Sequence, residues 1–237
     1  MTTEEFSNEF DVLLNSYSSG GIEFNEYEKS IFLTKAQEDL LVELYNGKNP
    51  FRESFEETEE IRRYLSNLVK TYTTTEKIAD ITGISDKSVF FKLPSDLWFI
   101  VYESVELRDD KLGCKDGNQV LVVPTTLDDY YNTYNNPFRG PGYRRVLRLD
   151  IDNGIAEIVS KYNISRYLVR YLSKPNPIIL VALPAHLNIN GESKITECDL
   201  HPALHRVILD RAVGLAIASK GCLLYTSPSP RDGATSR

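Results

Sequence analysis

Long apolar runs, cysteine and basic residues are scarce in this 237-residue chain, and each shortage excludes a class of protein. No run reaches the length of a transmembrane helix, and the opening "MTTEEFSNEFDVLL" lacks the basic-then-apolar pattern of a signal peptide. Cys114 and Cys198, the cysteines that precede residue 222, are too few and too far apart for a disulfide framework or a zinc site. We therefore expect a protein made in a cytosol, with no membrane partner, no metal and no cofactor.

The shortage of basic residues bears on nucleic-acid binding. Lys and Arg total 27 against 34 Asp and Glu, which gives a net charge of -7. This balance argues against a free-standing nucleic-acid binder, whose affinity depends on neutralising phosphates. The nucleophile elbow of hydrolases, the metalloprotease helix, the dinucleotide fingerprint and the kinase motifs are absent too. We expect a protein that is not an enzyme; the alternative, a small hydrolase with an unrecognised site, needs a concave pocket that gathers polar groups.

The last stretch, "CLLYTSPSPRDGATSR" at 222–237, differs in composition from the rest of the chain. Pro228 and Pro230 prevent a helix from continuing, and the Ser, Thr and Gly around them supply too little apolar area to fold. Its beginning, "CLLYTSPSPRD", resembles the translation of a transposon-end adapter used for shotgun sequencing libraries. We therefore expect 222–237 to be a non-native, disordered tail, Gly221 to be native, and the gene to be a fragment from metagenomic DNA that lacks its true C-terminus.

Helical periodicity marks residues 1–72, which we expect to form a helical layer. In "FNEYEKSIFLTKAQEDLLVELYNG" apolar and charged residues recur on opposite helical faces. Asn25 and Glu28 have the spacing of a capping box, and the closing Asn-Gly is a stop signal. A shorter helix is predicted over Thr3 to Asn15, and a third from Ser54 through Val69.

Residues 73–200 are instead rich in β-branched and aromatic residues punctuated by Gly, Pro, Asp and Asn, which predicts an antiparallel sheet or small sandwich. In "RRVLRLDIDNGIAEIV" the Asp-Asn-Gly between two alternating runs is a hairpin signal. A short helix is predicted to begin at Thr126, ahead of an Asn, Pro and Gly loop over 132–143. The predicted strands are "KSVFFKLP", "LWFIVYESVEL", "NQVLVVP", "RRVLRLDI", "GIAEIVS", "SRYLVRYL" and "PIILVAL".

A last helix is predicted over 201–221, packing back on the body, with Pro202 at its first position and a buried apolar stripe. The order of helices, sheet and helix is typical of an α+β fold.

Two stretches have a functional interpretation beside a structural one. Residues 76–93 place Gly83 at the turn position of a helix-turn-helix, which would make the protein a DNA-binding regulator. The structural interpretation, which we favour, is a strand entered through a turn at Gly83. His201 and His205 are four residues apart and could bind a metal, although His201 before a proline suits a helix cap better.

The loop "NNPFRGPGYRR" is the candidate partner interface. It lacks the Gly-Lys-Ser/Thr ending and the strand-to-helix setting of a phosphate loop. Aromatic and arginine side chains dominate interface hot spots, although an ordinary surface turn has the same composition. The candidate interface residues are Asn136, Pro137, Phe138, Arg139, Arg144 and Arg145.

The order of segments along 1–221 resembles structural proteins of crAss-like bacteriophages of gut Bacteroidales. More loosely, it is similar to the tail tubular and head-to-tail adaptor proteins of short-tailed double-stranded DNA phages. The segments are "FNEYEKSIFLTKAQEDLLVELYNG", "FFKLPSDLWFIVYESVEL", "VVPTTLDDYYNTYNNPFRGP", "YLVRYLSKPNPIIL" and "ECDLHPALHRVILDRAVGLA". Motifs shared with the looser relatives are Leu-Pro-x-Asp (Leu93, Pro94, Asp96), Tyr-x-x-x-Pro (Tyr171, Pro175) and acidic-Leu-x-Pro (Asp199, Leu200, Pro202).

This resemblance implies a virion structural protein that forms a ring, a dodecamer stacked beneath the portal to extend the DNA channel. It implies as partners further copies of the chain, the portal or a neighbouring ring protein, and DNA in transient passage. The protein would assemble in the bacterial host cytoplasm and end in the tail or connector of the virion. A ring subunit needs two unlike surfaces, because head-to-tail contacts join different patches.

Overall fold

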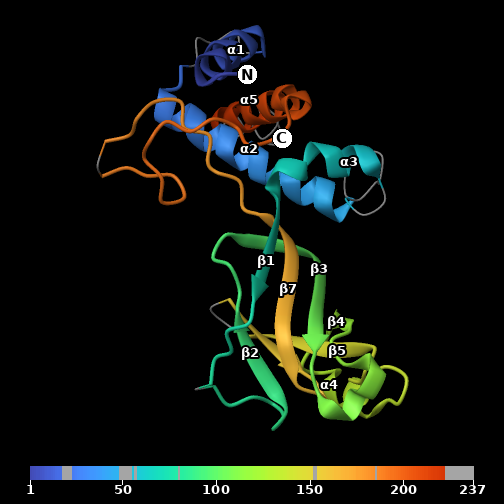
Figure 1. Cartoon of the computed structure of the whole chain (residues 1–237). Coiled ribbons are helices and arrows are strands. Elements are labelled where there is room, and N and C mark those ends of the chain that lie inside the picture. The colour runs from blue at the N-terminus through green and yellow to red at the C-terminus, as the bar shows by residue number, and fades with distance from the viewer. Residues whose placement is uncertain are drawn as a thin grey trace, which may run out of the picture. The chain divides into compact units, whose positions relative to one another are not determined.

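The computed structural model describes residues 1–17, 23–47, 55, 58–79, 81–151, 154–184 and 186–221 (Figure 1). Contacts divide the chain into two compact units. Unit 1 comprises Met1–Asn67 and Pro175–Arg237, and unit 2 comprises Leu68–Lys174. Unit 2 is therefore an insertion in the sequence of unit 1. The predicted tail at 222–237, the "SSGG" stretch at 18–21 between the first two predicted helices, and the start of the third predicted helix lie outside the described residues.

Unit 1 is built on helices whose ends follow the sequence signals. The Oδ1 atom of Asn25 accepts a hydrogen bond from the Glu28 amide, and the Glu28 carboxylate accepts one from the Asn25 amide, each 2.9 Å long. This confirms the predicted capping box, and Gly47 ends the same helix at a φ of 67°. The elements are α1 (Thr3–Tyr17), α2 (Glu26–Asn46), α3 (Glu59–Tyr64), the 3-10 turns η1 (Ser66–Leu68) and η3 (Pro202–Leu204), and α5 (His205–Gly221). None of the helices in the described part of the chain is long and apolar enough to span a membrane.

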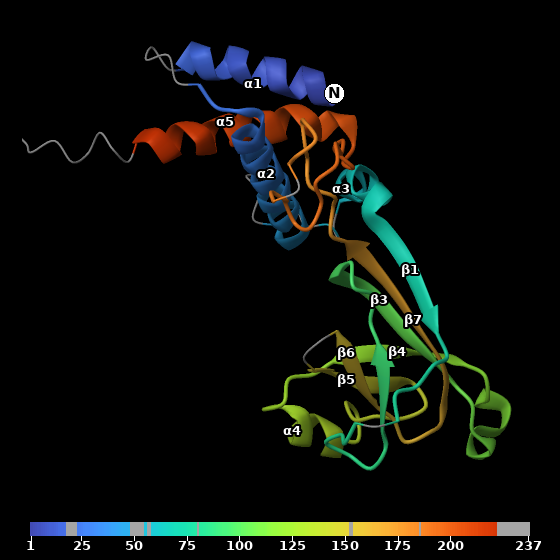
Figure 2. The same ribbon diagram turned by 90° about the vertical axis from the view of Figure 1, so that its left-hand side faces the viewer.

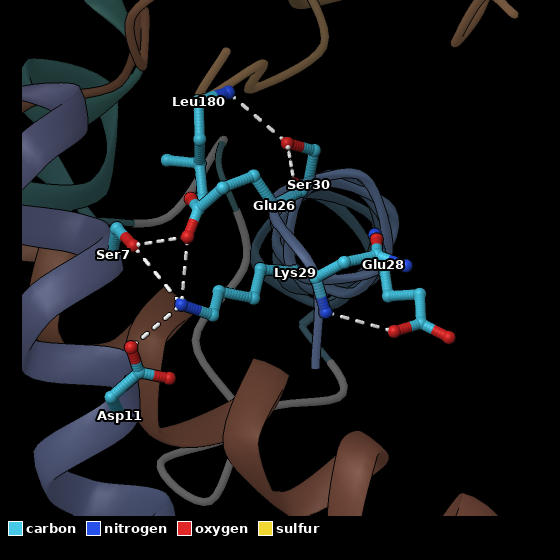
Figure 3. A network of polar contacts seen from close by, with 8 residues as sticks. Ser7, Asp11, Glu26, Glu28, Lys29, Ser30 and Leu180 are labelled. Carbon is cyan, nitrogen blue, oxygen red and sulfur yellow. Dashed lines mark hydrogen bonds and ion pairs between the residues drawn. The ribbon is translucent and has the colours of Figure 1, made fainter. Parts of the chain in front are cut away.

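A buried ammonium group joins α1 to α2 (Figure 3). Lys29 Nζ lies 2.7 Å from Asp11 Oδ2, 2.9 Å from Glu26 Oε1 and 3.1 Å from Ser7 Oγ. The side chain is 4% exposed. Figure 2 shows α1 beside α5, with α2 crossing them. The apolar faces of the three helices form the core of this unit, with Phe6, Phe10, Leu33, Leu41, Ile208 and Leu209 among its buried side chains.

The segment after residue 174 corrects one strand prediction. "PIILVAL" has strand composition, but in the structure it forms only an isolated bridge between Ile179 and Thr196. Its backbone amides bond instead to hydroxyl groups of α2: Ile178 N to Thr34 Oγ1 at 3.0 Å and Leu180 N to Ser30 Oγ at 3.0 Å. These contacts place the segment in unit 1 with the helices.

Unit 2 is a single seven-stranded sheet in the order β1-β7-β3-β4-β5-β6-β2. Every neighbouring pair is antiparallel except β4 and β5, which are parallel. The strands are β1 (Val69–Thr74), β2 (Ser88–Lys92), β3 (Leu97–Leu107), β4 (Gln119–Pro124), β5 (Arg145–Ile151), β6 (Ile155–Val159) and β7 (Ile164–Ser173). A 3-10 segment, η2 (Asp110–Lys115), and a short helix, α4 (Tyr130–Asn135), lie between strands.

The sheet curls so that its two ends meet around one core. Phe91 on the edge strand β2 contacts Tyr167 on β7, with ring centroids 5.1 Å apart, although these strands are far apart in the sheet order. The Tyr167 hydroxyl donates to Glu103, and Arg148 Nη1 lies 3.2 Å from the same carboxylate, so the buried charges are paired. Burial is the main cause that raises the pKa of Tyr167 far above its usual range.

The fold confirms the α+β prediction and corrects its details. The third predicted helix ends early: α3 stops at Tyr64, and Val69 begins β1 because it pairs with Leu172 of β7. The predicted short helix begins at Tyr130 rather than Thr126. Asp152 and Asn153 of the predicted hairpin turn lie outside the described residues, but β5 and β6 pair antiparallel on either side of them. Composition predicts boundaries at 72/73 and 200/201, whereas the contacts group 175–200 with the helices.

Candidate partner interface

The parallel pairing of β4 with β5 explains why a long excursion separates them. Parallel neighbours need a crossover connection, because the chain must return to the starting end of the sheet. Residues 125–144 make this connection and contain α4 and the candidate loop. Tyr130 of α4 is buried against Leu147, Leu149 and Val159, so the excursion is anchored to the sheet. The loop therefore stands on a packed base.

Short-range contacts fix the tip of the loop. The Asn136 side-chain oxygen accepts from the amides of Phe138, at 2.8 Å, and Arg139, at 3.1 Å. The Gly140 amide donates to the Asn136 carbonyl at 2.7 Å. A Cβ at Gly140 would lie 2.6 Å from the carbonyl oxygen of Tyr134, so this close turn requires glycine. The Phe138 side chain is left 85% exposed.

Basic and aromatic side chains gather beside this tip. Lys115 Nζ lies 3.5 Å from the centre of the Tyr143 ring, and Arg144 Cζ lies 5.3 Å from it. Such cation–π contacts leave the positive charges at the surface. A cleft of about 280 Å³ is lined by Pro137, Phe138 and residues 140–145. A second, of about 390 Å³, is lined by residues 118–121 with Lys115, Tyr143 and Arg144.

The structure brings all six predicted interface residues into one loop at the start of β5. Phe138, Arg139 and Arg144 are exposed, whereas Arg145 is half-buried as the first residue of the strand. Sequence reasoning missed Lys115, Leu121 and Tyr143, which line the neighbouring cleft. Tyr143 lay within the quoted loop and fits the same aromatic criterion. The other two are brought there by the parallel pairing of Leu121 with Arg145, which no local signal shows.

The alternative sites do not form in the described residues. Residues 76–79 and 81–93 contain β2 and a bridge from Ile78 to Phe90 but no helix, so the helix-turn-helix hypothesis is wrong. His201 Nδ1 accepts from the Ala203 amide at 3.3 Å, which confirms the predicted cap. The described residues hold no group of three or more His, Cys, Asp or Glu suited to a metal ion.

The remaining reactive groups serve the fold. His205 is buried, with Nε2 3.0 Å from the Leu200 carbonyl oxygen, and burial lowers its pKa. The Cys198 thiol lies 3.2 Å from Gln37 Oε1, and burial raises its pKa to about 11, which makes it a poor nucleophile. The Cys114 thiol is free and its side chain is exposed.

The aspartates of the short motifs that carried the resemblance accept hydrogen bonds from distant parts of the sequence. In unit 2 the Tyr171 hydroxyl donates to Asp96 at 2.9 Å, and Lys70 Nζ lies 2.7 Å from the same carboxylate. Burial would raise the pKa of Asp96, but these two hydrogen bonds outweigh it and lower the pKa. In unit 1 the Asp199 carboxylate accepts from the Asn176 amide at 2.9 Å. The acidic motif positions therefore hold backbone and side-chain donors from distant segments.

Comparison with known proteins finds matches along the whole described chain. The family model described as phage tail ring protein 3/4 matches residues 1–226. Ring protein 3 of Bacteroides phage crAss001 is 56% identical over 222 residues, which cover 93% of this chain and 96% of that protein. Ring protein 4/5 of the same phage is 34% identical over 230 residues, which cover 92% of this chain and 93% of that protein.

Proposed function

The chain belongs to the phage tail ring protein 3/4 family and is a structural ring subunit of a crAss-like phage, and we propose that its ring stands where portal meets tail and extends the DNA channel. The observation that carries this proposal is coverage: two ring proteins of one phage match more than nine tenths of the chain. One phage thus has more than one ring protein similar to this chain. The higher identity to ring protein 3 supports a place in the corresponding layer.

The proposed partners are copies of this chain, twelve to a ring as the resemblance implies, and the ring or portal proteins above and below. The protein acts as a structural part and carries out no reaction. It assembles in the host cytoplasm and remains in the tail or connector of the virion. Double-stranded DNA passes through without being gripped.

The first experiment measures the mass of the full chain in solution, alone and mixed with the portal protein of the same phage genome. A discrete ring, or a stable complex with the portal, is the expected result. The chain ending at Gly221 serves as a control for association through the last residues. A monomer that ignores the portal would contradict the proposed position.

We assign the docking role to the loop that carries Asn136, Pro137, Phe138, Arg139, Arg144 and Arg145. Phe138→Ala and Arg139→Ala remove exposed side chains while Asn136 and Gly140 keep the turn. We expect both variants to assemble poorly while their melting temperatures stay within about 2 °C of the wild type, because surface substitutions change stability little. If the variants lost monomer stability to the same extent as they lost assembly, the loop would instead be a structural element of the monomer.

A further inference from the structure

Unit 1 contains a groove whose floor is apolar and whose rim is charged. It lies between α2 and α5, has a volume of about 450 Å³, and is lined on the apolar side by Ala36, Val42, Gly214 and Leu215. A Cβ built on Gly214 meets no atom within 4 Å, so the groove is open at this point of α5. The glycine leaves room for a side chain from another molecule.

The rim of this groove presents a carboxylate. Arg211 on α5 is hydrogen-bonded to Glu43 on α2, so its charge is already matched within the chain. Asp39, one turn before Glu43, also lines the groove, is exposed and acts on the same Arg211 charge, so two carboxylates share one guanidinium. A ligand of this groove would therefore offer an apolar group for the floor and a cation for Asp39.

Unit 2 displays that combination on the loop tip. Phe138 and Arg139 are adjacent and exposed, and the hydrogen bonds of Asn136 and the tight turn at Gly140 hold them in place. A loop ordered before binding loses little conformational freedom on association. A cavity of about 150 Å³ is enough for a benzene ring, so the groove accommodates a phenylalanine side chain with room for the guanidinium at its rim.

The charges of the two units also complement each other between copies. Unit 1 has 20 acidic and 12 basic residues, whereas unit 2 has 14 acidic and 15 basic residues. Two copies that met through their acidic units would repel each other. A contact between unit 2 of one copy and unit 1 of the next avoids this repulsion and brings unlike patches together, as a closed head-to-tail ring requires.

From these observations we propose that Phe138 of one copy enters the α2–α5 groove of a second copy, where Arg139 pairs with Asp39. The proposal rests on the ring function and names the partner of the loop as another copy of this chain. Each copy then offers one loop and receives one, so the contact repeats around the ring. Phe138 is the anchor, and the ion pair fixes its orientation.

The first test fills the groove without harming the fold. Gly214→Leu adds a side chain where the structure leaves open space, in a helix that gains from losing a glycine. We expect a melting temperature equal to or above that of the wild type, together with loss of ring assembly in sedimentation velocity. A Gly214→Leu chain that still assembles as the wild type does would overturn the proposal.

The second test uses charge reversal in the full chain. Arg139→Glu and Asp39→Arg each place like charges across the contact, and we expect each variant alone to need about tenfold or more higher concentration to assemble. Lys111→Glu and Glu4→Arg are the matched controls, exposed residues outside the loop and the groove whose reversal changes the net charge equally. Both controls are expected to assemble as the wild type does.

Mixing the two variants tests whether the contact joins separate copies. In an equimolar mixture, wild-type Arg139 of one chain meets wild-type Asp39 of the other, and the two introduced residues also form a pair of opposite charges. The mixture and the double variant should therefore both recover assembly. The proposed contact is overturned if neither the mixture nor the double variant recovers assembly. It is also overturned if Arg139→Glu and Asp39→Arg assemble no worse than the two control variants. Neither result contradicts the ring function itself.

Two further outcomes separate the contact from the ring function. If the wild type never forms a ring, alone or on the portal, the proposed function fails and the contact fails with it. A second outcome is that the wild type, Arg139→Glu and Gly214→Leu all form rings equally well, but the two variants no longer bind the portal. The loop would then contact the portal or a neighbouring ring protein. This result would overturn the proposed self-contact and leave the ring intact.

Discussion

At the scale of single residues, Lys29 shows how one buried charge holds two helices together. Burial by itself would lower its pKa, but the hydrogen bonds to Asp11 and Glu26 outweigh burial and raise the pKa above 10.5. Replacing Lys29 with methionine keeps most of the volume and removes the charge. We expect Lys29→Met to lose about 2 kcal/mol in urea unfolding, because both carboxylates are partly exposed and recover some hydration.

The control for this prediction is Lys35→Met, an exposed position on the same helix, which should change stability by about 0.5 kcal/mol or less. The pH dependence has a fixed sign. Because folding raises the pKa of Lys29, the charged side chain stabilises the folded state fully at pH values below 10.5. This stabilisation is lost as the pH rises through the pKa of Lys29 in the folded state. The difference in unfolding free energy between the wild type and Lys29→Met should therefore become smaller above pH 10.5. A difference that grows there contradicts the assigned network.

At the scale of elements, two glycines predict opposite effects of one substitution. A Cβ at Gly83 would lie 2.5 Å from the Cβ of Ser88 and would also clash with the buried Glu157 carboxylate, which accepts from the Ile84 amide at 2.8 Å. Gly83→Ala should therefore destabilise by about 2 kcal/mol, by overpacking the turn that leads into β2. Gly214→Ala should stabilise by about 0.5–1 kcal/mol, because it lies in a helix beside open space. If denaturant unfolding showed that both substitutions stabilise, or that both destabilise, this interpretation of the two sites would be refuted.

Elements with local signals were predictable from the sequence, and those defined by distant partners were not. The ends of α2 followed from Asn25, Glu28 and the Asn-Gly stop, since caps act within one turn. The start of β1 was missed because Val69 is a strand residue only through its pairing with Leu172. "PIILVAL" was misassigned because the hydroxyls of α2 take the amides that a neighbouring strand would have bonded.

The candidate interface divides in the same way. Phe138 and Arg139 could be chosen from composition, because an exposed aromatic beside an arginine in a Pro and Gly loop stands out locally. Lys115 and Leu121 could not, because the parallel β4–β5 pairing brings them to the loop. The groove at Gly214 was also hidden, since it depends on how α2 and α5 pack.

At the scale of the whole molecule, the net charge of -7 predicts weak contact with DNA. A channel should let DNA slide, and each phosphate contact made by a basic residue would strengthen binding. We expect the surface that faces DNA to be acidic or neutral, and duplex DNA to bind the ring more weakly than about 10⁻⁴ M at physiological salt. Fluorescence anisotropy with a labelled duplex measures this. Tight DNA binding that weakens steeply with salt concentration would contradict the prediction. A density map of the ring in which Lys and Arg line the channel would contradict it too.

The insertion of unit 2 into unit 1 sets the order in which the protein is completed during synthesis. Helices α1 and α2 emerge from the ribosome before the inserted unit, whereas α5, which packs against both, emerges after it. Residues 68–174 begin and end on paired strands, with Val69 opposite Leu172, so the inserted unit can close before the helices around it do. The apolar faces of α1 and α2 therefore lack their partner helix α5 while the whole sheet of unit 2 is translated. The core that α1, α2 and α5 share can therefore form only after residues 205–221 have been translated, so translation itself delays the closing of this helical core.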